Sequence, residues 1–172
     1  RKSRAVAAMV NSTLKIGVVG CGYWGPNLIR NFSQNLNVSE VVCCDLNEER
    51  LKQMRQLFHN TTTTSDYKEL LNSDVDAVII ATPVATHYKL AKEFLEHGKH
   101  VLIEKPITRS SSEALDLIKT AEKAGKTLMV DHTFEYTVSV RKIKELLVKN
   151  ELGKIFNINI IRINLGLFQK DV

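Results

Sequence analysis

The sequence contains few of the residues that build disulfide-rich or metal-stabilised proteins. It has three cysteines in 172 residues, Cys21, Cys43 and Cys44, and two of them are adjacent in an apolar run. No CxxC pair and no cluster of histidines has the ligand spacing of a zinc site, so no metal is predicted. Because scattered cysteines of this kind are typical of a reducing compartment, we expect the protein to be cytoplasmic.

Long apolar segments are also missing from the sequence. No hydrophobic run approaches the roughly 20 residues that cross a bilayer, so no membrane association is expected. The short apolar segment near the amino terminus is followed at once by polar residues, which is unlike a secretory signal. Residues 1–13 are interpreted as a leader that is expected to be disordered.

The charge is balanced enough to argue against a nucleic-acid partner. The net charge is +5, from 24 basic and 19 acidic residues. The basic residues are spread along the chain, and their densest group, residues 140–150, has the spacing of a solvated helix face. No nucleic-acid partner is therefore predicted.

Apolar runs alternate with helical patterns through most of the chain. Runs such as "AVIIA" and "VVCC" are apolar throughout, which is typical of parallel strands buried on both faces. The patterns predict strands at 14–19, 40–45, 61–64, 76–81, 100–105 and 127–132. They predict helices at 26–35, 47–58, 66–72, 86–97, 110–124 and 137–150. This order predicts an α/β fold with a doubly wound parallel sheet over residues 14–133.

Residues of known capping preference mark several predicted helix boundaries. Asn47, Thr86 and Ser110 each stand at the predicted start of a helix, where a side-chain oxygen can accept a backbone hydrogen bond. Gly98 and Gly125 follow the last apolar positions of two helices, where a left-handed residue often ends the helix.

The pattern changes after about residue 134. One helix is followed by a β-rich run, "KIFNINIIRINLGLF", which spans residues 154–168. Residues 134–172 are therefore predicted to form the first helix and strand of a second, incomplete α+β domain. Because one strand cannot form a sheet alone, either it pairs with another chain in a homo-oligomer or the sequence is the front part of something longer.

A glycine-rich turn follows the first predicted strand. Gly20, Gly22 and Gly25 form G-x-G-x-x-G directly before a helix, and Asp45 ends the second strand 20 residues after Gly25. This spacing in a βαβ pattern predicts a dinucleotide site, in which the glycines admit the pyrophosphate and the acidic residue binds the ribose. The alternative is a glycine turn that holds no ligand.

The acidic residue also predicts which dinucleotide is bound. The carboxylate of Asp45 can accept hydrogen bonds from both ribose hydroxyls and would repel a 2′-phosphate, so NAD is favoured over NADP. Arg50, one turn into the next helix, weakens this preference slightly.

A second group of candidate residues follows the later strands. "ATPVATH" (residues 81–87) and "IEKPIT" (residues 103–108) both stand at predicted carboxyl ends of strands, where open α/β sheets bind ligands. Lys105 is a candidate for proton exchange at such a position. The alternatives are that His87 only decorates a helix start and that Lys105 is a surface lysine before a turn.

Together, "GCGYWGPNLIRNF", "ATPVATHYKLAKEFLEHGKHVLIEKPIT" and "VDHTFEYTVSVRKIKELL" resemble the glucose-fructose oxidoreductase/inositol dehydrogenase (Gfo/Idh/MocA) family. The resemblance implies a Rossmann domain that binds NAD(P), followed by a domain with a large open sheet that shapes the substrate pocket. It implies sugar, nucleotide-sugar or cyclitol substrates and a catalytic or substrate-orienting lysine in the E-K-P motif, whose proline is often cis.

The resemblance also implies roles for individual residues. The pyrophosphate would be surrounded by Gly20, Gly22, Tyr23, Trp24 and Gly25, and the adenine ribose would contact Asp45. The nicotinamide half would lie along Thr82, Pro83 and His87, with Glu104 and Lys105 beside the nicotinamide ribose and the substrate. The sequence departs from the family pattern at Asp131, where the family has a glycine before the histidine that matches His132.

The function implied is that of an NAD(P)-dependent oxidoreductase. Hydride would pass between a CH–OH carbon of a small sugar or cyclitol and nicotinamide, with Lys105 as the catalytic residue. The alternative is a non-catalytic NAD-binding module, such as a redox sensor or a partner subunit.

Overall fold

The computed structural model describes residues 13–59, 61–161 and 163. The chain divides into two compact units, Arg1–His132 and Thr133–Val172, which are described separately. The strands of the first unit are β1 (Leu14–Val19), β2 (Val38–Cys44), β3 (Thr61–Thr64), β4 (Ala77–Ile80), β5 (His100–Glu104) and β6 (Leu128–Asp131). Its helices are α2 (Gly25–Ser33), α3 (Glu48–Leu57), α4 (Tyr67–Asn72), α5 (Val84–Glu96) and α6 (Ser111–Ala124).

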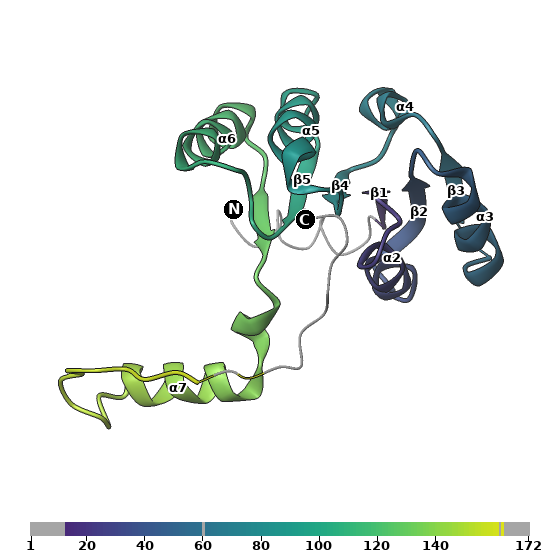
Figure 1. The fold of residues 1–172 in the computed structure, drawn as a ribbon. Coiled ribbons are helices and arrows are strands. Elements are labelled where there is room, and N and C mark those ends of the chain that lie inside the picture. Colours follow the sequence, from purple (N-terminus) through teal and green to yellow (C-terminus); the bar gives the residue numbers. More distant parts are fainter. Residues whose placement is uncertain (1–12, 60, 162, 164–172) are drawn as a thin grey trace, which may run out of the picture. The chain divides into compact units, whose positions relative to one another are not determined.

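The six strands form one sheet in the order β3-β2-β1-β4-β5-β6. Every neighbouring pair is parallel, and the chain order reverses between β1 and β4 at the centre of the sheet. At such a reversal the connections from adjacent strands leave toward opposite faces, which opens a crevice at the strands' carboxyl ends. The predicted doubly wound parallel sheet is confirmed (Figure 1).

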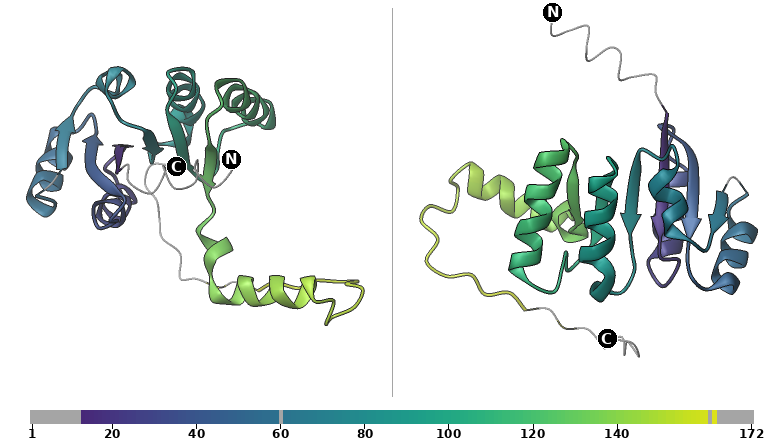
Figure 2. Two further views of the ribbon diagram at one scale, coloured as in Figure 1. Left: turned by 180° about the vertical axis from the view of Figure 1, so that it is seen from behind. Right: turned by 90° about the horizontal axis from the view of Figure 1, so that it is seen from above.

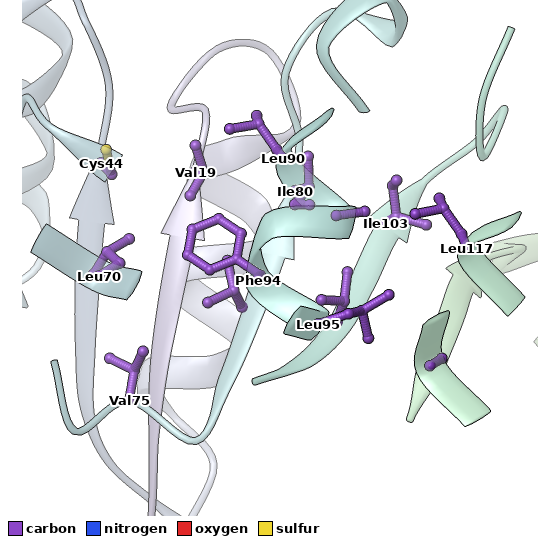
Figure 3. Close-up of a cluster of buried hydrophobic side chains, with 14 residues drawn as sticks. Val19, Cys44, Leu70, Val75, Ile80, Leu90, Phe94, Leu95, Ile103 and Leu117 are labelled. Carbon is purple, nitrogen blue, oxygen red and sulfur yellow. The ribbon is translucent and has the colours of Figure 1, made fainter. Parts of the chain in front are cut away.

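Helices cover the sheet on both faces. In Figures 1 and 2, α4, α5 and α6 lie on one side of the sheet, and α2 and α3 lie on the other. Each side has its own core because the strand side chains alternate between the faces. On the first side, Phe94 of α5 packs among Val19, Leu70 and Ile80 (Figure 3). On the other, Ile29 of α2 and Leu51 of α3 pack on β1 and β2.

The local capping chemistry explains most of the helix boundaries. The side chain of Asn47 accepts from the backbone N–H groups of residues 49 and 50, and Ser110 accepts from that of Glu113. Gly125 follows α6 with φ of 63°, a left-handed conformation that glycine adopts without a Cβ penalty. These predicted helix boundaries are confirmed.

The predicted start of α5 is wrong by two residues. The helix begins at Val84 with Pro83 before it, and no side chain caps it. The hydroxyl of Thr86 lies inside the first turn and donates to the carbonyl oxygen of Pro83 at 2.8 Å. Because proline has φ near −65° without any cap, the helix can start directly after it.

The second unit contains a short 3₁₀ helix, Thr133–Tyr136, and α7, Val138–Val148. The strand predicted at residues 154–168 is wrong for the part that the structure describes, since residues 154–161 and 163 form no strand. A β-rich sequence becomes a strand only when it pairs with another strand, and no described residue pairs with it. Residues 162 and 164–168 of that prediction lie outside the described residues.

No helix in the described ranges is long and apolar enough to cross a membrane.

Candidate functional site

The turn after β1 depends on glycine for two close backbone approaches. Gly20 has φ of +100°, and a Cβ there would lie 2.5 Å from the carbonyl oxygen of Ala81. A Cβ on Gly25 would collide with the carbonyl oxygen of Gly20. These contacts hold the start of α2 close to the ends of β1 and β4 and leave no room for larger side chains.

Gly22 differs, because the protein itself does not fill the space in front of it. The atom nearest to a Cβ added at Gly22 is Nη1 of Arg50, at 3.8 Å. Among the described hydrogen bonds, none uses the backbone N–H groups of residues 22–25 as donors. A helix N-terminus with free N–H groups and open space is the arrangement that binds phosphate groups. The residues present therefore fit a dinucleotide pyrophosphate.

Asp45 connects the end of β2 to the glycine turn. Its Oδ2 accepts from the backbone N–H of Cys21 at 2.7 Å, and its Oδ1 accepts from that of Asn47 at 2.8 Å. The side chain is almost buried, and Nη1 of Arg50 lies 3.5 Å from Oδ2. A carboxylate oxygen has two lone pairs, so each oxygen can still accept from a ribose hydroxyl.

Asp45 therefore orders the turn as well as being placed for a ribose. The sequence motif indicated only the second role. The bond to Cys21 could not be read from the sequence, since it joins backbone and side chain across 24 residues.

Tyr23 and Trp24 stand at the exposed tip of the turn. Their rings meet edge to face, with centroids 5.3 Å apart, and 69% of Tyr23 and 46% of Trp24 are exposed. Large exposed aromatic groups beside free N–H groups could cover a bound pyrophosphate. Their predicted cofactor contact stays a prediction.

The segment after β4 is fixed by hydrogen bonds that the sequence did not indicate. The hydroxyl groups of Thr82 and Thr86 lie 2.7 Å apart. His87 is buried, and its Nε2 and Nδ1 lie 2.8 Å from the carbonyl oxygen of Thr82 and 2.9 Å from that of Pro106. Both of its ring nitrogens thus face the protein's own backbone, whereas the family resemblance implied a place along the cofactor.

The E-K-P segment lies at the end of β5. The strand ends at Glu104, so Lys105 belongs to the following turn and not, as predicted, to the strand. Lys105 is exposed and its peptide bond to Pro106 is cis. Its backbone N–H donates to Oε2 of Glu104 at 3.2 Å. No described ion pair involves the side-chain ammonium group of Lys105, and the residue is open to solvent.

Glu104 lies opposite Asp131 in the parallel β5–β6 ladder. Partial burial, followed by the charge and hydrogen bonding of Asp131, raises the pKa of the Glu104 carboxyl. Asp131 stands where the family resemblance has glycine, so this pair of carboxyl groups is a feature of the present sequence. It places negative charge close to Lys105.

None of the three cysteines takes part in a disulfide. All three are free thiols and all are buried. Burial raises the pKa of Cys44 to about 12, which keeps it a thiol. Within the described residues, no group of three or more His, Cys, Asp or Glu side chains is arranged to hold a metal ion.

The predicted residues gather along one edge of the sheet. The glycine turn, Asp45, Thr82 and Lys105 follow β1, β2, β4 and β5, which are neighbours in the sheet and point the same way. The glycine turn stands at the reversal of strand order, where doubly wound sheets bind ligands. Fold and site together define a dinucleotide-binding Rossmann domain.

Comparison with known proteins gives the family. The family described as "Oxidoreductase family, NAD-binding Rossmann fold" (GFO_IDH_MocA) matches residues 14–132, more than half of the chain. The chain therefore belongs to the Gfo/Idh/MocA family and contains its NAD-binding domain, as the sequence predicted.

Individual relatives agree with this assignment. The uncharacterized oxidoreductase YrbE of Bacillus subtilis is 30% identical over 80% of this chain and 40% of its own length. Inositol 2-dehydrogenase of Rhodococcus erythropolis is 31% identical over 84% of this chain and 42% of its own. The chain thus spans less than half the length of these relatives.

A solved structure is similar over the same region. The WlbA dehydrogenase of Bordetella pertussis, in complex with NADH and UDP-GlcNAcA, superposes with a TM-score of 0.79 and 26% identity. The match covers 85% of this chain and 42% of that one.

Proposed function

We propose that this chain is the NAD-binding part of a dehydrogenase that acts on a CH–OH carbon of a sugar, nucleotide sugar or cyclitol. The observation that carries the proposal is the joint placement of the free N–H groups of the glycine turn, the Asp45 carboxylate and Lys105 at one sheet edge. The relatives support the substrate class, since they include an inositol dehydrogenase and a glucoside dehydrogenase.

Each group of residues along this sheet edge has its own role in the proposal. The N–H groups of residues 22–25 bind the pyrophosphate, and the free lone pairs of Asp45 accept from the ribose hydroxyls. Lys105, exposed at the end of β5, holds the substrate hydroxyl and receives or returns its proton. The nicotinamide supplies the acceptor for the hydride when it is bound.

The proposal also covers the cellular location of the protein and its association with further copies of itself. Three free thiols are compatible with a reducing compartment, and we place the protein in the cytoplasm. We also propose that the segment 154–168 takes part in contacts between copies of the chain.

A cofactor titration tests the proposal. Calorimetry with NADH and NADPH should show that the wild-type chain prefers NADH. Asp45→Asn keeps an acceptor for only one of the Cys21 and Asn47 N–H groups, and it removes the charge and a ribose acceptor. It should weaken NADH binding by about 1–3 kcal/mol and reduce the preference against NADPH.

Glu49→Gln is the matched control, because it removes one exposed negative charge from the first turn of α3. It should change neither affinity. A folded wild-type chain that binds neither cofactor would contradict the proposal.

A further inference from the structure

His87 lies between two segments that carry candidate site residues. It is 1% exposed, at the first turn of α5, and its ring fills the space between the segment after β4 and the segment after β5. Nε2 lies 2.8 Å from the carbonyl oxygen of Thr82, and Nδ1 lies 2.9 Å from that of Pro106.

Among the described residues, the imidazole ring makes the only hydrogen bonds between these segments. The β4–β5 ladder ends at the pair Ile80 and Ile103. Beyond it, no other described hydrogen bond joins residues 81–86 to residues 104–109. Each nitrogen meets one carbonyl oxygen, so a neutral ring donates to one of them and a doubly protonated ring donates to both. An aliphatic side chain would fill the space without joining the segments.

We propose that His87 is a positioning residue that holds Thr82 and the E-K-P segment in register for the nicotinamide half of the cofactor. This inference rests on the proposed function, because it assigns the ends of β4 and β5 to that half. His87 acts through backbone carbonyls and does not itself touch the cofactor, since both ring nitrogens face the protein.

Comparing two ligands separates this role from a general structural one. NADH carries the nicotinamide half, whereas ADP keeps only the adenosine and the two phosphates. His87→Leu should weaken NADH binding about tenfold, the effect expected from one or two lost hydrogen bonds, and should leave ADP binding within about twofold. The ratio of the two affinities is the measured quantity.

Two further variants allow the proposal to be tested even if His87→Leu folds poorly. Asn places its amide nitrogen near the position of Nδ1, so His87→Asn can still donate toward Pro106 and should recover part of the NADH affinity. His97→Leu is the matched control. His97 follows the other end of α5, where it is exposed, and the described hydrogen bond of its ring joins Nδ1 to the carbonyl oxygen of Glu93 in the same helix.

The outcomes distinguish the two proposals. A wild-type chain that binds neither ligand overturns the proposed function and this inference with it. If the wild type binds both, and His87→Leu and His87→Asn weaken both equally or weaken neither, only the inference is overturned. Selective loss of NADH affinity, with partial recovery in His87→Asn and no change in His97→Leu, supports it.

Discussion

Lys105 is the residue on which the proposed chemistry depends most. Its side chain is exposed beyond the end of β5, with no described ion pair to occupy its charge. Lys105→Met removes the ammonium group and keeps most of the apolar stem. In a form that carries a substrate domain, kcat should fall about 10²–10⁴-fold, as when a general acid–base group is lost.

Binding of NADH to the present chain should change little in Lys105→Met, because the pyrophosphate and the adenine ribose are assigned to the glycine turn and to Asp45. Lys119→Met, on the exposed side of α6, is the control for loss of one positive charge. Steady-state kinetics with an unchanged kcat for Lys105→Met would refute the catalytic role.

Glu104 should make stability depend on pH in a direction opposite to that of most carboxyl groups. Burial and Asp131 raise its pKa in the folded chain. The folded state therefore keeps this proton more tightly than the unfolded state, whose glutamate pKa is about 4.3. The stabilising contribution is complete below that value and is lost as pH rises through the folded pKa.

The difference in unfolding free energy between wild type and Glu104→Gln isolates this effect. Denaturant unfolding should show the wild type losing stability relative to the variant as pH rises from the unfolded glutamate pKa of about 4.3 through the raised folded pKa. Asp131→Asn should lower the Glu104 pKa, because it removes the neighbouring charge. A constant difference across this range would contradict the assignment.

At the scale of the element, substitutions at two glycines of the turn should have different effects, one on the stability of the chain and the other on cofactor binding. Gly20→Ala forces a Cβ against the backbone of Ala81 at φ of +100° and should destabilise the chain by about 1–3 kcal/mol. Gly22→Ala meets no protein atom closer than 3.8 Å, so its unfolding free energy should stay near that of the wild type. Its Cβ would point into the space assigned to the pyrophosphate, so NADH affinity should fall.

Thermal unfolding and NADH titration of both variants check this contrast. A Gly22→Ala chain that binds NADH as the wild type does would show that the pyrophosphate lies elsewhere.

Most of the elements were predictable because their causes are local. Uniformly apolar runs indicated β2, β4 and β5, and the capping oxygens of Asn47 and Ser110 indicated where two helices begin. The start of α5 was missed, because Thr86 offered a capping group while Pro83 ended the loop without one.

Only those parts of the site that belong to a sequence motif could be predicted. The glycine spacing indicated the turn and Asp45, but the bond from Cys21 to Asp45 depends on how β1 and β2 align. The contacts of His87 were likewise hidden, because they require the ends of β4 and β5 to be neighbours. Contacts between elements become visible only once the sheet order is known.

At the scale of the whole molecule, the two units differ in how completely their apolar residues are buried. The first unit buries two separate cores against one sheet. In the second, α7 has no fully buried residue. The predicted strand after α7 shows the limit of propensity, since β-branched residues favour pairing but do not supply a partner.

The segment 154–163 should drive association between copies of the chain. Phe156, Ile158 and Ile160 are 86%, 69% and 82% exposed, and they belong to a β-rich stretch without a described pairing partner. Apolar side chains with unpaired backbone groups form a template for another chain. Light scattering should give an average molar mass that increases with protein concentration. The double variant Phe156→Lys/Ile160→Lys should give a smaller molar mass at the same concentration.

The matched control is Leu36→Lys, which replaces an apolar residue that is 95% exposed but lies in the turn between α2 and β2. It should associate as the wild type does, because a single exposed leucine offers no extended edge. Hydrogen exchange provides the second measurement. A monodisperse wild-type monomer in which the amides of residues 154–161 and 163 are protected would mean that this segment pairs within its own chain, and the proposed contact between copies would then fail.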